Sequence, residues 1–162
     1  MQRSIRATWF LAIVLLCAVE MRAQPMPIPY GLSVSVEDAK KAAVAAIAEA
    51  RKNRLRMAIA VADTGGELVY FEKMDGTQTA SVQIAIDKAR AAVMYKRSTK
   101  ALEDALAEGG RGLRYLQLRG AVSVEGGIPL IVEGKIVGAI GVSGGTNTQD
   151  GQCAQAGAAA LK

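Results

Sequence analysis

The sequence predicts an α/β protein of the α+β type, with a central, largely antiparallel five-stranded sheet flanked by helices. Apolar, β-branched runs occur next to one another and are joined by short glycine turns, which is typical of β-hairpins. Longer stretches between them place apolar residues at helical spacing. The expected order of elements is α-β-β-α-α-β-β-β-α. At 162 residues the chain has the length of a single domain.

The helices are predicted from their capping residues and apolar stripes. Ser35 is a typical N-cap and opens a helix over about 35–53, whose alanine-rich stripe implies close packing. Helical periodicity also covers residues 77–95, and a short helix follows over about 98–108. These segments are expected to cover the sheet.

Short apolar runs supply the strands. The five predicted strands are residues 57–62, 67–73, 120–124, 129–132 and 135–142. Glu133 and Gly134 fit a two-residue hairpin turn in which glycine supplies a positive φ. Gly109, Gly110 and Gly112 are expected to form a flexible connector.

A glycine turn leads from the last strand into the last helix. Thr146 as N-cap and Gln149 three residues later fit a capping box. Such a helix start exposes backbone N–H groups and a positive dipole end, which suits a carboxylate, phosphate or propionate. An ordinary tight connection explains the pattern equally well. The predicted ligand-binding residues are Gly144, Gly145, Thr146, Gln149, Asp150, Met74 and Asp75.

The chain contains no histidine, the commonest general base and a common ligand of metals and haem. Most hydrolytic triads are thereby excluded, and no metal site is predicted. Asp150 and Glu125 lie beside the glycine-rich elements and are the candidate catalytic bases. Gly138, Gly141 and Gly144 do not form a dinucleotide fingerprint, because two of them lie within a strand. They are expected to let a helix or backbone approach the sheet closely.

The amino-terminal segment differs from the rest of the chain. Two arginines precede an apolar run, and Ala23 offers a cleavage site, as in a secretory signal peptide. The apolar run is too short for stable membrane insertion. We therefore expect a periplasmic or secreted protein. The expected organisation is a signal peptide over 1–23, a proline-rich extended arm over 24–31 and a folded domain over 32–162.

The amino-acid composition indicates which kinds of binding partner are to be expected. The formal net charge of +5 is not concentrated in a Lys/Arg cluster and only 4% of residues are aromatic, so no nucleic-acid partner is predicted. Cleavage would leave Cys153 without a disulfide partner in the chain, and we expect a buried, inert thiol. A small Ala- and Gly-rich sheet protein gains core by burying faces between subunits, so we predict a homo-oligomer.

Three segments resemble the GlcG/HbpS-like haem-degrading-domain family, which also includes the carboxy-terminal domain of PduO proteins. They are AVADTGGELVYFEKMDG at 60–76, ASVQIAIDKARAAVMYKRST at 80–99 and VEGGIPLIVEGKIVGAIGVSGGTNTQD at 124–150. The resemblance covers about 32–161. It implies an α/β fold with a central antiparallel sheet, oligomeric assembly and, in some members, binding of haem or iron.

The predicted function is that of an exported small-ligand-binding protein, with haem or a related tetrapyrrole or iron as the ligand implied by the resemblance. Because histidine is absent, axial ligation of haem would come from Met, Tyr, Lys or a hydroxyl group. Two alternatives stay open. One is an enzyme or accessory protein acting on a small organic acid, and the other is an oligomeric scaffold or a partner of a sensor or transport protein.

Overall fold

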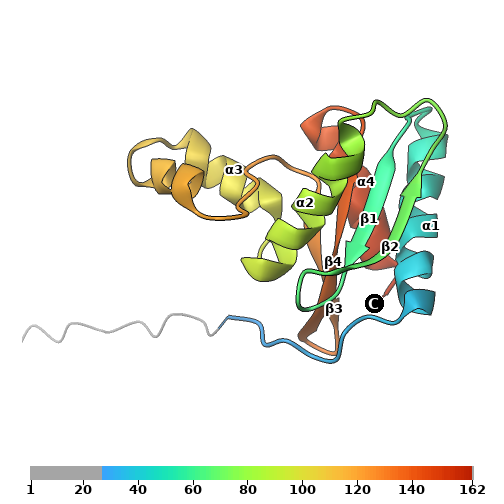
Figure 1. The fold of residues 1–162 in the computed structure, drawn as a ribbon, viewed down its shortest axis with the longest axis horizontal. Helices are drawn as coiled ribbons and strands as arrows, with labels where there is room; N and C mark the ends of the chain where they lie inside the picture. The colour runs from blue at the N-terminus through green and yellow to red at the C-terminus, as the bar shows by residue number, and fades with distance from the viewer. Residues whose placement is uncertain (1–26, 162) are drawn as a thin grey trace, which may run out of the picture.

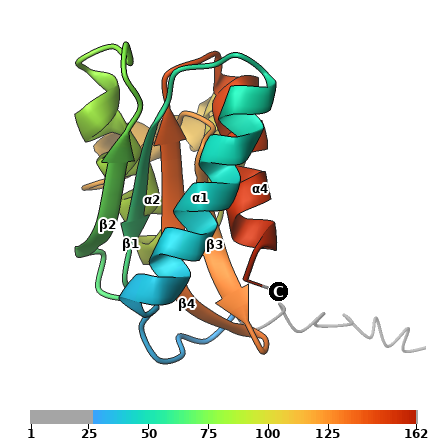
Figure 2. The ribbon, with the colours of Figure 1, turned by 90° about the vertical axis from the view of Figure 1, so that its right-hand side faces the viewer.

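Helices cover both faces of a four-stranded antiparallel sheet in the computed structural model, which describes residues 27–161 (Figure 1). The strands are β1 (Ala58–Ala62), β2 (Leu68–Lys73), β3 (Gly127–Val132) and β4 (Lys135–Ser143), in the spatial order β2-β1-β4-β3. The helices α1 (Val36–Lys52) and α4 (Asn147–Ala159) lie side by side on one face, and α2 (Ser81–Met94) covers the other (Figure 2). The predicted signal peptide lies outside the described residues.

Strand β1 is buried on both faces, and its side chains alternate in size. Ile59 and Val61 belong to the core beneath α1 and α4. Ala58, Ala60 and Ala62 face the opposite way, toward α2. Small side chains on this second face allow α2 to pack close to the sheet, because a helix approaches as near as the intervening side chains permit.

The expected role of the strand glycines is confirmed. A Cβ atom on Gly141 would collide with the carbonyl oxygen of Ala85 and lie 2.5 Å from the backbone nitrogen of Ala89, both on α2. A Cβ atom on Gly138 would collide with the carbonyl oxygen of Ala62 in β1. These glycines therefore serve close approach of backbone to backbone.

Local turn and cap chemistry also folds as predicted. Glu133 and Gly134 connect β3 to β4 with φ angles of 48° and 72°, the left-handed pair that a tight hairpin turn requires. Ser35 caps α1 through its side chain. Thr146 and Gln149 form the reciprocal capping box of α4.

The prediction of five strands is wrong, because residues 120–124 do not pair with the sheet. This run is bounded by Gly120 at φ 74° and Gly126 at φ 129°. Both glycines break extended backbone, and the residues between them pair with no strand of the described sheet. It serves instead as the return path to β3.

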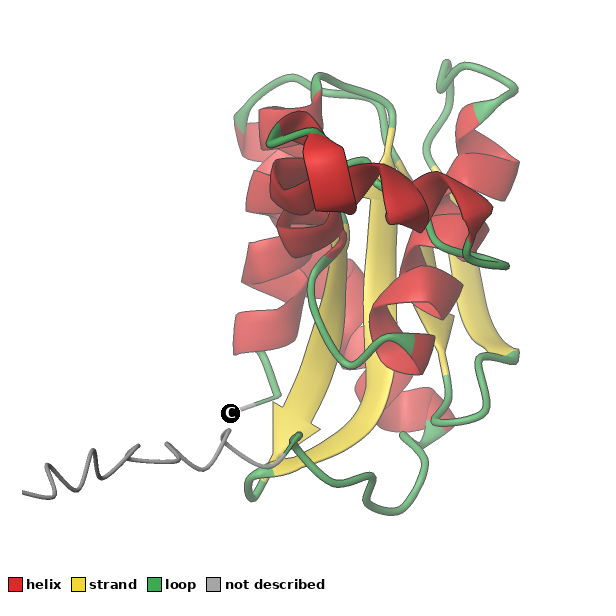
Figure 3. Ribbon diagram, turned by 90° about the vertical axis from the view of Figure 1, so that its left-hand side faces the viewer, coloured by secondary structure: helices red, strands yellow, loops and turns green. Residues whose placement is uncertain are grey.

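The prediction of a flexible glycine connector is also wrong. The 3₁₀ helix η1 (Gly110–Gln117) follows α3 (Thr99–Ala107) and packs against it. A Cβ atom on Gly112 would collide with the carbonyl oxygen of Ala105, so glycine is needed here for contact between the two helices. Together α3 and η1 project from the body of the domain, and Figure 3 shows them in front of the sheet.

The end of the proline-rich arm runs extended beside β4. The backbone N–H of Ile136 donates to the carbonyl of Pro29 at 2.9 Å, and Gly31 donates back to Ile136 at 2.8 Å. The hydroxyl of Tyr30 donates to the carbonyl of Val93 on α2 at 2.8 Å. The arm is therefore fixed to both the sheet and a helix. Within residues 27–161, no helix combines the length and apolar character that crossing a membrane requires.

Candidate functional site

Three of the hollows on the described part of the chain bring several charged side chains together. The Glu125 pocket has a volume of about 460 Å³, and its lining includes Glu125, Lys100, Gln152 and Gln155. The Arg90 pocket, about 580 Å³, is lined by Arg90, Met94, Arg119 and Val122 among others. The arginine hollow, about 230 Å³, is lined by Arg51, Arg54, Leu55, Arg56 and Met74. The first two volumes lie within the range of about 300–1,000 Å³ that is typical of small-molecule sites.

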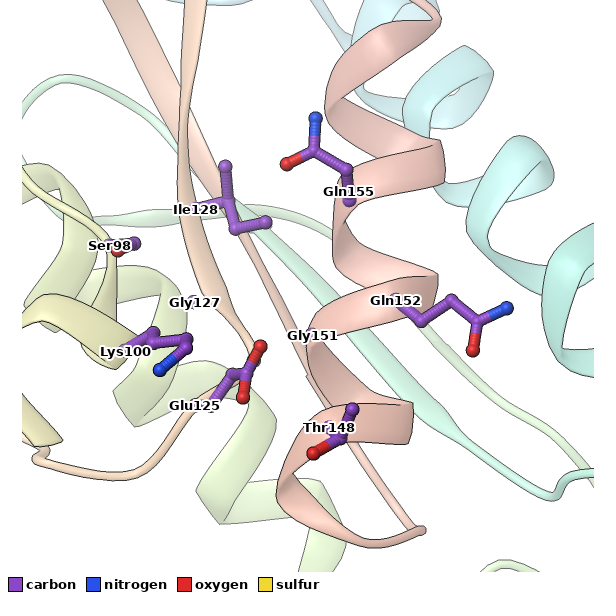
Figure 4. A pocket seen from close by; sticks show the side chains of 10 residues that line it. Ser98, Lys100, Glu125, Gly127, Ile128, Thr148, Gly151, Gln152 and Gln155 are labelled. Carbon is purple, nitrogen blue, oxygen red and sulfur yellow. The ribbon is translucent and has the colours of Figure 1, made fainter. Parts of the chain in front are cut away.

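The Glu125 pocket lies between the start of α3, the loop before β3 and the first turns of α4 (Figure 4). The Glu125 carboxylate occupies the space that a Cβ atom on Gly151 would fill, so glycine at this position of α4 makes room for it. The backbone N–H of Glu125 donates to Glu103 at 2.6 Å, which fixes the loop. This part of the sequence-predicted site therefore lines a pocket.

Lys100 gives the Glu125 pocket a cation beside its carboxylate. Its Nζ lies 2.7 Å from Asp104, and that hydrogen bond raises the pKa of Lys100, with smaller contributions from the charges of Glu125 and Glu103. The ammonium group is therefore firmly protonated at neutral pH. A lining of opposite charges, side-chain amides and hydroxyl groups suits a small polar ligand and offers no thioether or imidazole donor.

Asp150 does not line this pocket. Its side chain is 4% exposed, and its Oδ2 accepts a hydrogen bond from Nζ of Lys88 at 2.7 Å. Lys88 also donates to the carbonyl of Val142 at 3.2 Å. Burial raises the pKa of Asp150, while the hydrogen bonds from Lys88 and Gly145 act in the opposite direction. The carboxylate is thus enclosed by its own chain.

The glycine turn uses most of its own hydrogen-bonding groups. The N–H of Gly145 donates to Asp150 Oδ1 at 2.9 Å, and the N–H of Thr146 donates to Gln149 Oε1 at 2.9 Å. The amides of Asn147 and Thr148 occupy helix positions that have no partner within the helix. An anion at this turn stays a prediction, and these two amides are the donors that would serve it.

Two other predicted ligand-binding residues, Met74 and Gly144, lie next to Met57. The N–H of Met74 donates to the carbonyl of Met57 at 2.9 Å, and a Cβ atom on Gly144 would come within 3.0 Å of the Met57 Cα. Met74 lines the arginine hollow, and Asp75 is exposed in the following turn. Of the predicted ligand-binding residues, Met74 alone therefore lines one of these hollows, and the candidate base Glu125 lines another.

Sequence reasoning did not assemble the Arg90 pocket. Arg90 and Met94 are one helical turn apart on α2, while Arg119 and Val122 come from the loop after η1. The Arg90 side chain donates to the carbonyl of Gly66 at 3.0 Å, which directs the guanidinium toward the β1–β2 turn. The i,i+4 spacing of Arg90 and Met94 on α2 was a signal that the sequence contained. The sequence contained no signal that the loop after η1 would line the same pocket.

The fold and its hollows define a class of single-domain α+β proteins in which an antiparallel sheet lies between two helical layers and the surface carries pockets. The chain belongs to the family described as haem-degrading protein HbpS-like, whose model matches residues 34–159.

Curated relatives and solved structures agree with this assignment. Protein GlcG of Escherichia coli K12 is 40% identical over 95 residues, which cover 59% of this chain and 69% of GlcG. A double mutant of Streptomyces reticuli HbpS is 32% identical, with a TM-score of 0.73 over 90% of this chain and 98% of that one. The PduOC:heme complex is 28% identical, with a TM-score of 0.73 over 81% and 96%.

Proposed function

We propose that the protein binds haem or a related tetrapyrrole, and that the Arg90 pocket is the binding site. The main support is that a half-exposed methionine, Met94, lines one hollow together with two guanidinium groups, those of Arg90 and Arg119. Haem needs an apolar surround, an axial donor and partners for its propionates. The lining offers a thioether donor, two guanidinium groups and apolar contacts from Met94 and Val122, and it also carries the carboxylates of Glu67 and Asp87.

The side chains of Met94, Arg90 and Arg119 are chemically suited to haem. A thioether is an established axial ligand of haem iron, and arginine pairs with carboxylates through two parallel hydrogen bonds. Haem would supply the iron and its redox chemistry when bound. Met94 would hold the iron, Arg90 and Arg119 would orient the propionates, and Val122 would exclude water from one side of the ring. Arg90 lies 3.8 Å from Glu67 across the protein surface, and this weak ion pair leaves the guanidinium available.

A haem titration of the purified protein tests the proposal. The wild type should give a saturable Soret shift, with a spectrum unlike that of bis-histidine ligation. Met94→Leu keeps the volume of the side chain but removes the sulfur, so the spectrum should change and affinity should fall. Met74→Leu, the matched control, removes a thioether from the arginine hollow and should leave the titration unchanged. Equal titrations of wild type and Met94→Leu would move the site away from this pocket.

Export and assembly belong to the same proposal. A mature chain beginning near Gln24 would place the domain in the periplasm or outside the cell, and the arginines, apolar run and Ala23 support this. Amino-terminal sequencing of the cellular protein tests it, and intact Met1 in a cytoplasmic fraction would contradict it. A homo-oligomer is supported by exposed leucines on η1.

A second candidate function rests on the Glu125 pocket. Glu125 is half-buried and lines a polar hollow with Lys100, an arrangement that can orient a small organic acid and supply a base. Glu125→Gln should abolish turnover of such an acid while leaving the haem titration intact. Asp150→Asn is not a suitable control, because it leaves the buried Lys88 ammonium without its counterion and should destabilise the fold.

A further inference from the structure

We propose that the arginine hollow binds a small oxyanion carrying two or more negative charges, such as a phosphate or polycarboxylate. This site is separate from the Arg90 pocket, where we place haem. Arg51, Arg54 and Arg56 line this hollow of about 230 Å³, and its lining contains no acidic residue. The volume suits a compact anion. Each guanidinium presents a planar set of donors that matches the geometry of a phosphate or carboxylate.

The three charges have no protein counterion in the described part of the chain. Among residues 27–161, no carboxylate lies within ion-pairing distance of any of these guanidinium groups. Three like charges around one hollow repel one another, and an anion between them relieves that repulsion. The nearby Glu49 is occupied by Lys52, Asn53 and Gln152.

The dipole of α1 accounts for the position of one arginine, Arg51, but not for the positions of Arg54 and Arg56. Arg51 lies in the last turn of α1, where a cation is favoured by the helix dipole. Arg54 and Arg56 follow the end of the helix, and Arg54 adopts a left-handed conformation with φ 57°. Glycine is the usual residue at such a position, so arginine here carries a cost to the backbone.

The walls of the hollow are tied together. The N–H of Arg54 donates to Arg51 at 3.0 Å, which closes the turn after α1. Met57, which follows Arg56, accepts hydrogen bonds from the N–H of Met74 at 2.9 Å and from the Thr77 hydroxyl at 3.1 Å. The arginines therefore lie on backbone that is fixed before any ligand arrives, which lowers the entropic cost of binding.

The glycine turn braces the same wall from the other side. Gly144 packs directly against the carbonyl oxygen of Arg56, where any Cβ atom would collide. The methyl group of Met57 lies 3.0 Å from the position of a Cβ atom on Gly145. The segment that suggested anion binding in the sequence thus supports the loop that carries Arg56.

Calorimetric titration of the full chain with inorganic phosphate and pyrophosphate tests the site. Arg54→Gly combined with Arg56→Gln removes two guanidinium groups, and glycine at position 54 suits the left-handed backbone, so this variant should fold as stably as the wild type. Lys40→Gln combined with Lys41→Gln is the control, because it removes the same charge from exposed positions earlier on α1. Pyrophosphate should bind the wild type and the control with similar affinity. Loss of two charge-assisted contacts should weaken binding to the arginine variant about tenfold or more.

A vesicle arm distinguishes a free anion from a lipid headgroup. Binding to phosphatidic acid vesicles that is lost only in the arginine variant, without binding of pyrophosphate, would assign the same chemistry to a headgroup. Absence of both kinds of binding would overturn the proposal, and so would equal weakening in the arginine and lysine variants. The haem titration should be unchanged in the arginine variant, so the proposals for the two sites are tested independently of each other.

Discussion

Lys88 and Asp150 form a buried ion pair that joins the two helical layers, with 2.7 Å between Nζ and Oδ2 and side-chain exposures of 1% and 4%. Lys88 belongs to α2 and Asp150 to α4, which lie on opposite faces of the sheet. Gly126 leaves the space in which they meet, because a Cβ atom there would be 2.9 Å from the Lys88 Nζ and 2.9 Å from the Asp150 Cβ.

Breaking this ion pair should strongly destabilise the fold. Lys88→Met leaves a carboxylate buried without its cation, and we expect the free energy of unfolding to fall by about 3–5 kcal/mol. Adding Asp150→Asn to Lys88→Met should recover part of the loss, because the remaining side chain is neutral. Urea unfolding measures both variants. A change below about 1 kcal/mol for Lys88→Met would show that the pair is not enclosed as described.

Alkaline pH should reveal the burial of Cys153. Burial, with smaller contributions from Glu49 and Asp150, raises the pKa of this thiol from 9.0 to about 11. Between these values the unfolded chain loses the thiol proton and the folded chain keeps it, so stability falls as pH rises through that window and then levels off.

The thiol's contribution to this fall should be about 1–3 kcal/mol and should be absent in Cys153→Ala. Urea unfolding across the window measures it. Alkylation of the Cys153 peptide, followed by mass spectrometry, should be slow in the native protein at pH 8 and fast in urea. Rapid native labelling would contradict a buried thiol.

The glycine turn should tolerate loss of its cap better than an added methyl group. Thr146→Ala removes half of the capping box and should cost about 1 kcal/mol. Gly144→Ala forces a Cβ atom against the carbonyl of Arg56, and overpacking of this kind costs about 1–3 kcal/mol. The variant also strains a φ of 150°. Thermal unfolding ranks the two, and a reversed order would show that the turn can move away from Arg56.

Ligand binding gives a second test of the same turn. Gly145→Val should weaken an anion bound there more than Thr146→Ala does, because steric obstruction outweighs an exposed helix-start contact of about 0.3–1 kcal/mol. Calorimetric titration with inorganic phosphate measures both. Unchanged affinity in a folded, assembled Gly145→Val protein would leave the turn a purely structural role.

Assembly should depend on the projecting helices. Leu113 and Leu116 of η1 are 53% and 69% exposed, and apolar side chains displayed together favour burial against another subunit. Replacing both with glutamine should shift sedimentation toward smaller species. Leu32→Gln, at a leucine that is 91% exposed just after the arm, is the matched control and should not. A wild type that sediments as a monomer at micromolar concentration would refute assembly.

Elements set by local chemistry could be predicted from the sequence. The Glu133-Gly134 hairpin and the capping box of α4 depend on residues within a few positions of one another, so their signals are contained in short windows. The run at 120–124 looked equally strand-like, but a strand also needs a partner from elsewhere in the chain. Nothing within the run indicates that it lacks one.

The candidate site was predictable only in part for the same reason. Glu125 was identified because it lies next to conspicuous glycines. Lys88 was missed because a lysine on an alanine-rich helix is typical of surface charge, and its partner is 62 residues away. The Arg90 pocket and the arginine hollow each combine segments that only the tertiary fold brings together.

The ion pair also bears on how the chain matures. Lys88 leaves the ribosome 62 residues before Asp150 does, and Asp150 belongs to the last helix. Until that helix docks, the lysine has no counterion and keeps its water, so the two layers cannot close around it. A nascent chain would therefore remain incompletely folded until α4 has been translated and docked, and a chain truncated before α4 would lack the counterion of Lys88.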